Sequence, residues 1–387
     1  VLNRGQHTIS FGLQFQRNDL STETDQNGRG TLTFTGFETS QLTSKGQPVA
    51  GSGFDFADFL LGTPQSAAIT YGNSSLYFRQ NVWSAYVQDD YRIHPRLSLL
   101  LGLRYEIFQP YTEKYGVLTN LDLNPTYTAV AVVTPQSIVG PYSGAFPVGL
   151  VNTDYKNFGP RVGLAWKVPG TKHNTVIRAG YGMYYNGQAY NQFGLSLAQQ
   201  PPFAVSNNIV SSVGGELTIA NGFTGAVPGK NLLNTYAVNR NYRTPNAQTW
   251  TFSIQRDLSH GMFIEGTYVG TKGTDLDVYL SPNSAAPGTP LNSERRLPIP
   301  NATTFTYDTP VGNSSYNGMM LRFSQRFNHG ISFRATYTYS KSIDDASTFA
   351  GTVAQNFRDI SAERGLSSFD HRHVLDMNWV LTSRFRT

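Results

Sequence analysis

The chain has 387 residues, a formal net charge of +5 and no cysteine. Only 14% of its residues are charged and 13% are aromatic, whereas about a quarter of a typical soluble domain is charged. The missing cysteine excludes a disulfide framework and thiol chemistry, and the lack of any basic run argues against a nucleic-acid partner. The longest apolar runs are shorter than the roughly 18 residues of a membrane-spanning helix.

Alternation of apolar and polar residues at every second position is the dominant pattern, and it begins near the N-terminus. Ile9, Phe11, Leu13 and Phe15 oppose small and polar neighbours, and the alternation is clearest from Leu97 onward. A strand places alternate residues on opposite faces, whereas a helix would scatter them. In chain order we predict about twelve strands, over residues 5–16, 30–38, 65–71, 83–93, 97–108, 158–168, 175–185, 249–258, 262–270, 316–327, 331–340 and 371–384.

Short turns join eight of these strands into pairs, and long segments rich in Asn, Ser, Thr, Pro and Gly separate the pairs. This asymmetry is typical of a bacterial outer-membrane barrel, whose turns are periplasmic and whose loops are extracellular. Strands of about ten residues also have the length to cross a bilayer obliquely. We therefore predict an all-β fold, an antiparallel up-and-down transmembrane β-barrel. Residues 54–61 (FDFADFLL) lack the alternation and are predicted to form a short helix or turn at the periplasmic rim.

The two faces of the predicted strands differ in chemistry. One face is apolar and ends in aromatic residues, as expected at a lipid–water boundary. The residues predicted to face lipid or form this aromatic girdle are Trp83, Leu101, Tyr105, Trp166, Tyr185, Trp250, Tyr337 and Trp379. The other face carries glycine and charge, which suits a wet lumen better than a dry core. The residues predicted to face the lumen are Arg104, Glu106, Arg161, Arg178, Arg322 and Arg334.

Several segments together resemble the TonB-dependent receptors of Gram-negative bacteria. The segment WSAYVQDDYRIHPRLSLLLGLRYE, at 83–106, is similar to a barrel hairpin of that family. Five further segments are similar to the Oar-like branch of that family, which is common in Acidobacteria. They are NFGPRVGLAWKVPG (157–170), RAGYGMYYNG (178–187), YVGTKGTDL (268–276), YTYSKSIDDAS (337–347) and FDHRHVLDMNWVL (369–381). Each segment alone would be a weak match, and the collection is specific.

The resemblance implies a plugged barrel of about 22 strands that imports a bulky nutrient into the periplasm. Residues 1–387 are then expected to be an internal part of one barrel domain, because no signal peptide, TonB box, plug or C-terminal closing strand is recognisable. The implied location is the cell outer membrane. The implied partners are outer-membrane lipid, an unidentified nutrient, and the TonB–ExbB–ExbD energy-coupling complex, reached through the missing segments.

Two alternative interpretations fit the same residues, one with a different function and one with a different fold. In the first, the barrel only anchors surface loops that mediate adhesion or bind a matrix or glycan without transport. In the second, ranked last, the chain is a soluble β-sandwich or propeller, which would show repeats of about 40–50 residues. Hairpins here recur at irregular, wider spacings.

No enzymatic site is predicted, and neither a metal nor a cofactor is expected. His371 and His373 lie two positions apart, but no third ligand is evident and zinc needs at least three from the protein. Asp89 and Asp90 point to opposite faces of a strand and cannot act as a catalytic dyad. Phosphate-binding, dinucleotide and nucleophile-elbow motifs are absent from the sequence.

Overall fold

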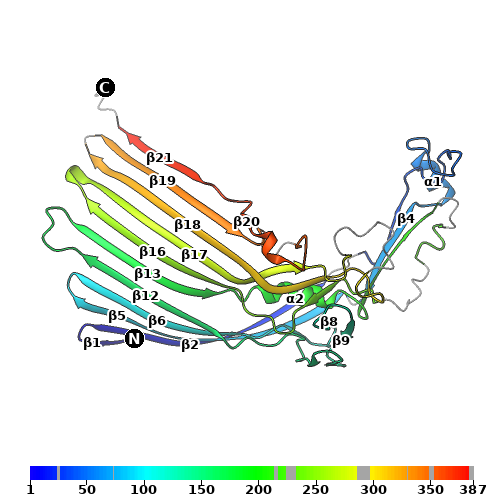
Figure 1. Cartoon of the computed structure of the whole chain (residues 1–387), viewed down its shortest axis with the longest axis horizontal. Coiled ribbons are helices and arrows are strands. Elements are labelled where there is room, and N and C mark those ends of the chain that lie inside the picture. Colours follow the sequence, from blue (N-terminus) through cyan, green and yellow to red (C-terminus); the bar gives the residue numbers. More distant parts are fainter. Residues whose placement is uncertain are drawn as a thin grey trace.

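A computed structural model describes residues 1–23, 27–72, 74–212, 217–223, 232–285, 297–328, 330–347 and 353–382. Within them the chain forms one broad, curved antiparallel sheet (Figure 1). Its long strands, in spatial order, are β2 (His7–Glu23), β5 (Ser75–His94), β6 (Leu97–Phe108), β12 (Asn157–Lys167), β13 (Thr175–Tyr185), β16 (Asn246–Asp257), β17 (Met262–Leu280), β18 (Thr306–Asn328), β19 (Ile331–Asp344) and β21 (His373–Leu381).

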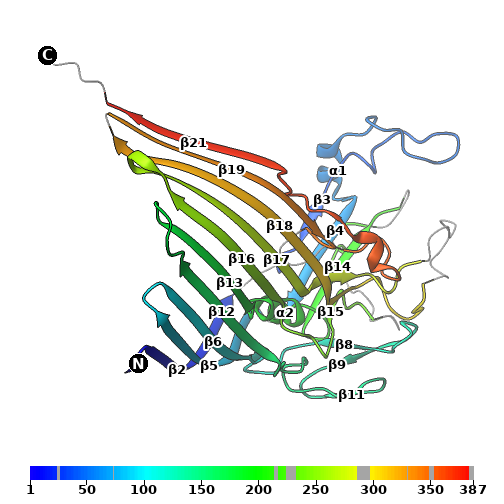
Figure 2. The same cartoon turned by 60° about the vertical axis from the view of Figure 1, so that its left-hand side comes forward.

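The spatial order of these ten strands equals their order in the sequence, so the predicted up-and-down arrangement is confirmed for them. The one parallel pairing in this sheet joins three residues of β15 (Tyr236–Val238) to β18, within the described part of the chain. The other short additions are β1 (Leu2–Arg4) on β2, β7 (Thr112–Glu113) on β5 and β20 (Gly365–Leu366) on β19. The sheet is open between β1–β2 and β21, as Figure 2 shows.

The tight turns lie together at one end of the sheet. Pro95 and Arg96 alone join β5 to β6. Between β16 and β17 a single 3-10 turn, η1 (Ser259–Gly261), places His260 and Gly261 at φ of 63° and 74°. Glycine adopts this left-handed region without the clash that a Cβ causes. We call this end of the strands the turn end. The opposite end of the strands, where the long connections lie, is the loop end.

Two predicted strands do not belong to the large sheet. Of residues 30–38 only β3 (Thr31–Thr33) is a strand, and 65–71 corresponds to β4 (Ser66–Gly72). β4 is the middle strand of a separate three-stranded sheet, in which it pairs with β3 on one side and with β14 (Ala204–Val210) on the other. This small sheet projects from the loop end as an arm (Figures 1 and 2). The large sheet therefore holds ten of the twelve predicted strands.

Residues 54–61 do form a helix, α1 (Asp55–Leu61), which ends at Gly62 with φ of 71°. Its predicted location at the periplasmic rim is wrong, because it lies on the arm, beyond the loop end (Figure 1). The buried carboxylate of Asp58 anchors it by accepting hydrogen bonds from the backbone N–H groups of Glu38 and Thr39.

The long connections are structured and contain the principal packed core. They form β8 (Asn120–Leu123), β9 (Val130–Val133), β10 (Val139–Gly140), β11 (Gly144–Ala145) and helix α2 (Ala189–Ala198), with η3 (Ile360–Glu363) nearer the C-terminus. We call the described parts of 109–156, 186–203 and 232–245 the loop cap. Its largest buried cluster joins Leu76 and Phe78 of β5 to Tyr111, Leu118, Val133, Phe146, Leu150, Val151, Tyr190, Phe193, Leu197, Ala198, Val238 and Tyr242.

No helix in the described residues is long and apolar enough to span a membrane. Large apolar side chains on the sheet are instead exposed, among them Leu13 (89%) and Trp379 (61%). Soluble monomers rarely expose apolar patches larger than a few hundred Å².

Candidate functional site

The cross-strand register separates the predicted residues into two sets on opposite faces. Directly paired residues share a face, as do residues two apart on one strand. By these rules Arg104, Glu106, Arg161, Arg178, Arg322 and Arg334 all lie on one face. The girdle residues Trp83, Leu101, Tyr105, Trp166, Tyr185, Trp250, Tyr337 and Trp379 all lie on the other. We call these the inner and outer faces.

The loop cap packs on the inner face. Leu76 and Phe78, which are 1% exposed, lie four and two positions along β5 from Gln80 and share its face. The α2 helix approaches the Phe78 ring closely, since a Cβ built on Gly194 would lie 3.4 Å from it. The inner face is thus covered at the loop end and carries charge further along.

Most of the inner-face arginines have a partner on the same face. Arg104 Nε lies 2.9 Å from the Glu106 carboxylate, and Arg322 lies 3.3 Å from Glu265. Arg178 donates to the amide oxygen of Gln255 at 3.1 Å. Arg161 instead lies over the Tyr184 ring, 4.8 Å from its centroid, and makes no ion pair with any described residue.

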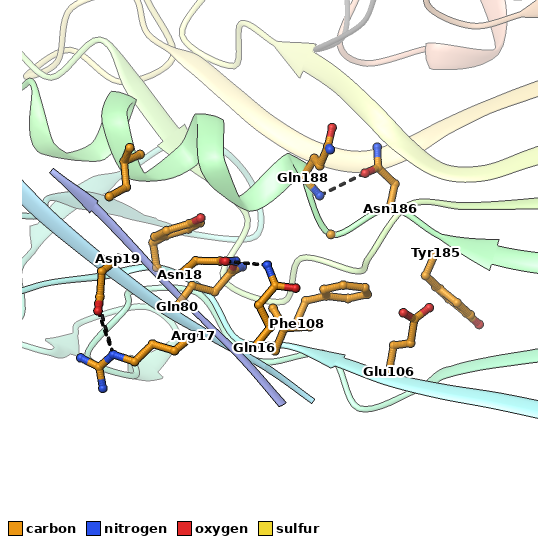
Figure 3. Close-up of a pocket in the computed structure, with 14 residues that line it drawn as sticks. Gln16, Arg17, Asn18, Asp19, Gln80, Glu106, Phe108, Tyr185, Asn186 and Gln188 are labelled. Atoms are coloured by element: carbon orange, nitrogen blue, oxygen red, sulfur yellow. Dashed lines mark hydrogen bonds and ion pairs between the residues drawn. The ribbon is translucent and has the colours of Figure 1, made fainter. Parts of the chain in front are cut away.

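A cavity of about 760 Å³ lies where the inner face meets the loop cap, and it is the candidate binding site (Figure 3). Amide side chains dominate the β2–β5 side: Gln16 donates to Asn18 at 2.7 Å, and Asn18 donates to Gln80 at 3.0 Å. Glu106 and Phe108 of β6 line a second side. The residues that close the cavity toward α2 are Asn186, Gly187 and Gln188.

These groups suit a solute that both donates and accepts hydrogen bonds. An amide offers two donors and an acceptor, and polar groups at the cavity's edge fix a ligand's orientation. Two carboxylates line the cavity and both are paired, Glu106 with Arg104 and Asp19 with Arg17.

Two tyrosine–carboxylate pairs fasten the loop cap to the long strands. Tyr236 donates to Asp308 at 2.8 Å, and Tyr242 donates to Asp277. The two aspartates lie on β17 and β18 beyond Gly270, which pairs with the girdle residue Trp250, so they are outside the membrane-spanning part of the sheet. Neither has an ion-pair partner among the described residues.

We call the two pairs, Tyr236 with Asp308 and Tyr242 with Asp277, the latch. Burial determines the protonation state of its carboxyl groups. Burial raises the pKa of Asp277 and raises that of Asp308 well above the ordinary value, with the Asp277 charge adding to the second shift. Asp308 is 1% exposed and its Oδ1 has no hydrogen-bond partner among the described residues. A neutral carboxyl is therefore favoured in at least one of the two positions.

The sequence did not reveal the cavity or the latch. Predicted strands stopped at 16 and began at 83, so Asn18 and Gln80 were assigned to connections. Tyr236 and Tyr242 fell in a segment predicted to be irregular. The available signal was the alternation that β17 continues beyond residue 270 and that β18 already shows before residue 316, outside the predicted strands.

The weaker candidates for chemistry have ordinary structural partners. His371 donates to the carbonyl oxygen of Phe369, and His373 lies 2.8 Å from the Tyr337 hydroxyl. Asp89 lies 2.7 Å from Nδ1 of His7. No group of three or more His, Cys, Asp or Glu in the described ranges is arranged to hold a metal ion.

Comparison with known proteins agrees with this geometry. The family described as "Outer membrane beta barrel domain" matches residues 1–387. The outer membrane transporter YddB from Escherichia coli is similar in structure, with 15% identity and a TM-score of 0.51 over 98% of this chain and 38% of its own.

Two further structures are more distant. The FrpB iron transporter from Neisseria meningitidis is 12% identical with a TM-score of 0.39, over 88% of this chain and 34% of its own. The ferripyoverdine receptor of Pseudomonas aeruginosa is 12% identical with a TM-score of 0.38, over 86% and 28%. The chain thus spans well under half the length of these proteins, and no curated protein matches it in sequence.

Proposed function

This chain belongs to the outer membrane beta barrel domain family and lies in the bacterial outer membrane, and on that premise we propose that it is the barrel portion of a TonB-dependent receptor that imports a bulky nutrient. The observation that carries the proposal is the largely polar recess on the inner face (Figure 3), which the loop cap borders on one side. A barrel used only as an anchor needs no such recess at its mouth. The Oar-like subtype and an acidobacterial source stay predictions from the sequence resemblance.

The proposal assigns the partners as follows. Outer-membrane lipid surrounds the outer face. The nutrient binds first at the amide-lined cavity, and energy comes from the TonB–ExbB–ExbD complex through segments outside residues 1–387. The protein performs no chemistry on the solute in this proposal.

Uptake in cells tests the proposal. Cells that express the gene are given labelled solutes too large for general porins, with and without a protonophore. We expect gene-dependent uptake that the protonophore abolishes. Replacing Gln16 and Asn18 with alanine should reduce uptake, whereas Asn81→Ala, one position from Gln80 on the opposite face, should not. Uptake that needs neither the gene nor the proton gradient would refute import.

A second candidate function, adhesion through surface loops, is favoured by the arm. Five large apolar side chains at its tip are between 52% and 69% exposed, namely Phe54, Phe56, Phe59, Leu60 and Leu61. Apolar clusters of this kind commonly mark contact surfaces. Replacing Phe56 and Phe59 with serine should abolish cell attachment to a surface or matrix if adhesion is the function, and should leave solute uptake unchanged if it is import.

A further inference from the structure

The strand side of the cavity is a patch of amide and aromatic side chains on the inner face. Gln16 of β2 pairs with Val82 of β5, and Val82 pairs with Phe108 of β6, so the three residues share one row. Asn18 and Gln80 form a pair two positions further toward the loop end. Neighbouring strands are about 4.8 Å apart, so the backbones that carry the Gln16 amide and the Phe108 ring are about 10 Å apart.

The amides of this patch form a hydrogen-bonded chain that is incomplete by itself. Gln16 donates to Asn18, and Asn18 donates to Gln80 (Figure 3). The chain ends at Nε2 of Gln80, which has no hydrogen-bond partner among the described residues, although Gln80 is only 4% exposed. A buried donor without an acceptor is costly. An oxygen atom of a solute can satisfy it once the neighbouring side chains rotate, and such rotamer changes are common at binding surfaces.

The side of the cavity toward α2 adds two further amides and fixes the aromatic ring. The side-chain oxygen of Asn186 accepts from the backbone N–H of Gln188 at 3.0 Å, which leaves the two N–H donors of the Asn186 amide for another partner. Gly187 lies so close to the Phe108 ring that a Cβ at this position would overlap it. The half-buried Phe108 is thereby held in the lining, where its ring contacts the cavity.

The charged groups around the cavity cancel one another. Arg17 lies 3.1 Å from Asp19, and Arg104 lies 2.9 Å from Glu106. These two pairs leave no uncompensated charge in the lining, and a charged solute would lose its hydration without gaining a free counter-charge. A peptide, which carries a charge at each terminus, is disfavoured for this reason.

We infer that the solute bound in this cavity is an uncharged oligosaccharide. Each sugar hydroxyl both donates and accepts a hydrogen bond, as the amides around it do. The C–H groups on one face of a sugar ring form an apolar surface, which packs against an aromatic ring such as that of Phe108. The cavity volume of about 760 Å³ lies within the range of roughly 300–1,000 Å³ of small-molecule sites, so it holds the end of a longer saccharide. The inference rests on the proposed import function and names the class of solute that is imported.

Binding to the refolded protein tests the inference separately from import. The 387-residue chain is refolded in a polyoxyethylene detergent, whose headgroup contains no sugar, and is titrated in a calorimeter. The probes are neutral gluco-, manno- and xylo-oligosaccharides, an oligogalacturonate, an alanine oligopeptide and a ferric hydroxamate chelate. We expect at least one neutral saccharide to bind, and the oligogalacturonate, with a carboxylate on each ring, to bind at least about tenfold more weakly.

The two possible failures give different results. If no neutral saccharide binds, the inference is overturned, and binding of the peptide or the chelate instead would leave import standing. If a neutral saccharide binds but cells show no gene-dependent uptake of it, the class of solute stands and import is refuted.

A matched pair of variants places the saccharide at the cavity. Gln80→Met keeps the length of the side chain but removes its amide, and it should weaken saccharide binding about five- to tenfold. Gln88→Met makes the same change eight positions along β5, on the same face but outside the cavity, and should bind like the unmodified chain. If Gln80→Met does not refold, Phe108→Leu, which removes the ring, should weaken binding at least about threefold. Unchanged binding by the cavity variant or an equal loss in Gln88→Met would contradict the assignment.

Discussion

At the residue scale, the faces of the central strands could be predicted because a period of two is fixed by the backbone and not by packing. Leu100 and Leu101 show both the strength and the limit of this reasoning. Leu101 continues the apolar series, and the register places it on the outer face beside Val162. Leu100 breaks the series, and it pairs with Asp90 and Gly163 on the inner face. Hydrophobicity alone gives no account of why a leucine lies there.

These two neighbours provide a matched pair of substitutions. Leu101→Arg places a charge in the middle of the apolar band and should cost roughly 2–4 kcal/mol of the free energy of unfolding. Leu100→Arg puts the same side chain on the inner face and should cost much less. Each position has an aspartate directly across on β5, Asp90 for Leu100 and Asp89 for Leu101, so the comparison isolates the effect of the face. Denaturant titration of both variants in lipid vesicles measures the difference. Equal losses for the two would mean that both faces have the same environment.

At the element scale, the hairpins of the large sheet were predictable and the connections were not. Alternation and tight turns are local signals, so the bounds of β6 and β13 are those expected from the sequence. The strand predicted at 65–71 shows the failure, because β4 has the same local pattern but pairs in the arm. The loop cap depends on contacts such as Asn120 to Val238, 118 residues apart, for which a single sequence has no periodic signal.

The latch makes the loop cap sensitive to pH. Because burial raises the pKa of Asp277 and Asp308 in the folded protein, their contribution to stability is complete below the ordinary aspartate value of 3.8 and falls as the pH rises through the raised values. Two carboxylates would then repel each other where no cation compensates them. Amide hydrogen exchange in residues 236–242, corrected for the intrinsic effect of pH, should become faster as the pH is raised.

Asp308→Asn keeps that position neutral and should remove most of this pH dependence. Asp376→Asn, on the inner face of β21, is the control and should retain it. The latch would lose its role if residues 236–242 showed the same corrected protection at every pH, or if Asp308→Asn responded to pH like the unmodified chain.

At the scale of the whole molecule, two exposed features predict how the chain behaves outside a membrane. The outer face is an apolar surface, and all nine residues of β21 are exposed. A strand at the edge of a sheet offers unpaired N–H and C=O groups to other chains, and burial of apolar surface favours association by about 25 cal/mol per Å². We therefore expect aggregation in plain buffer and strand content only in detergent or lipid. Light scattering with circular dichroism tests this, and a monomer that melts cooperatively in buffer would contradict it.

The loop cap implies an order of assembly. Its buried cluster draws on β5, on residues 111–151, on α2 and on Val238 and Tyr242, so no single connection contains enough of it to fold alone. Each of these segments must therefore cross the bilayer unfolded, and the cluster can close only after the strands up to β16 have delivered them to the far side. The loop cap, which is the part of the molecule with a packed core like that of a soluble protein, is then the last part to become ordered. Until it does, its tyrosines and leucines are exposed to proteases and chaperones outside the cell.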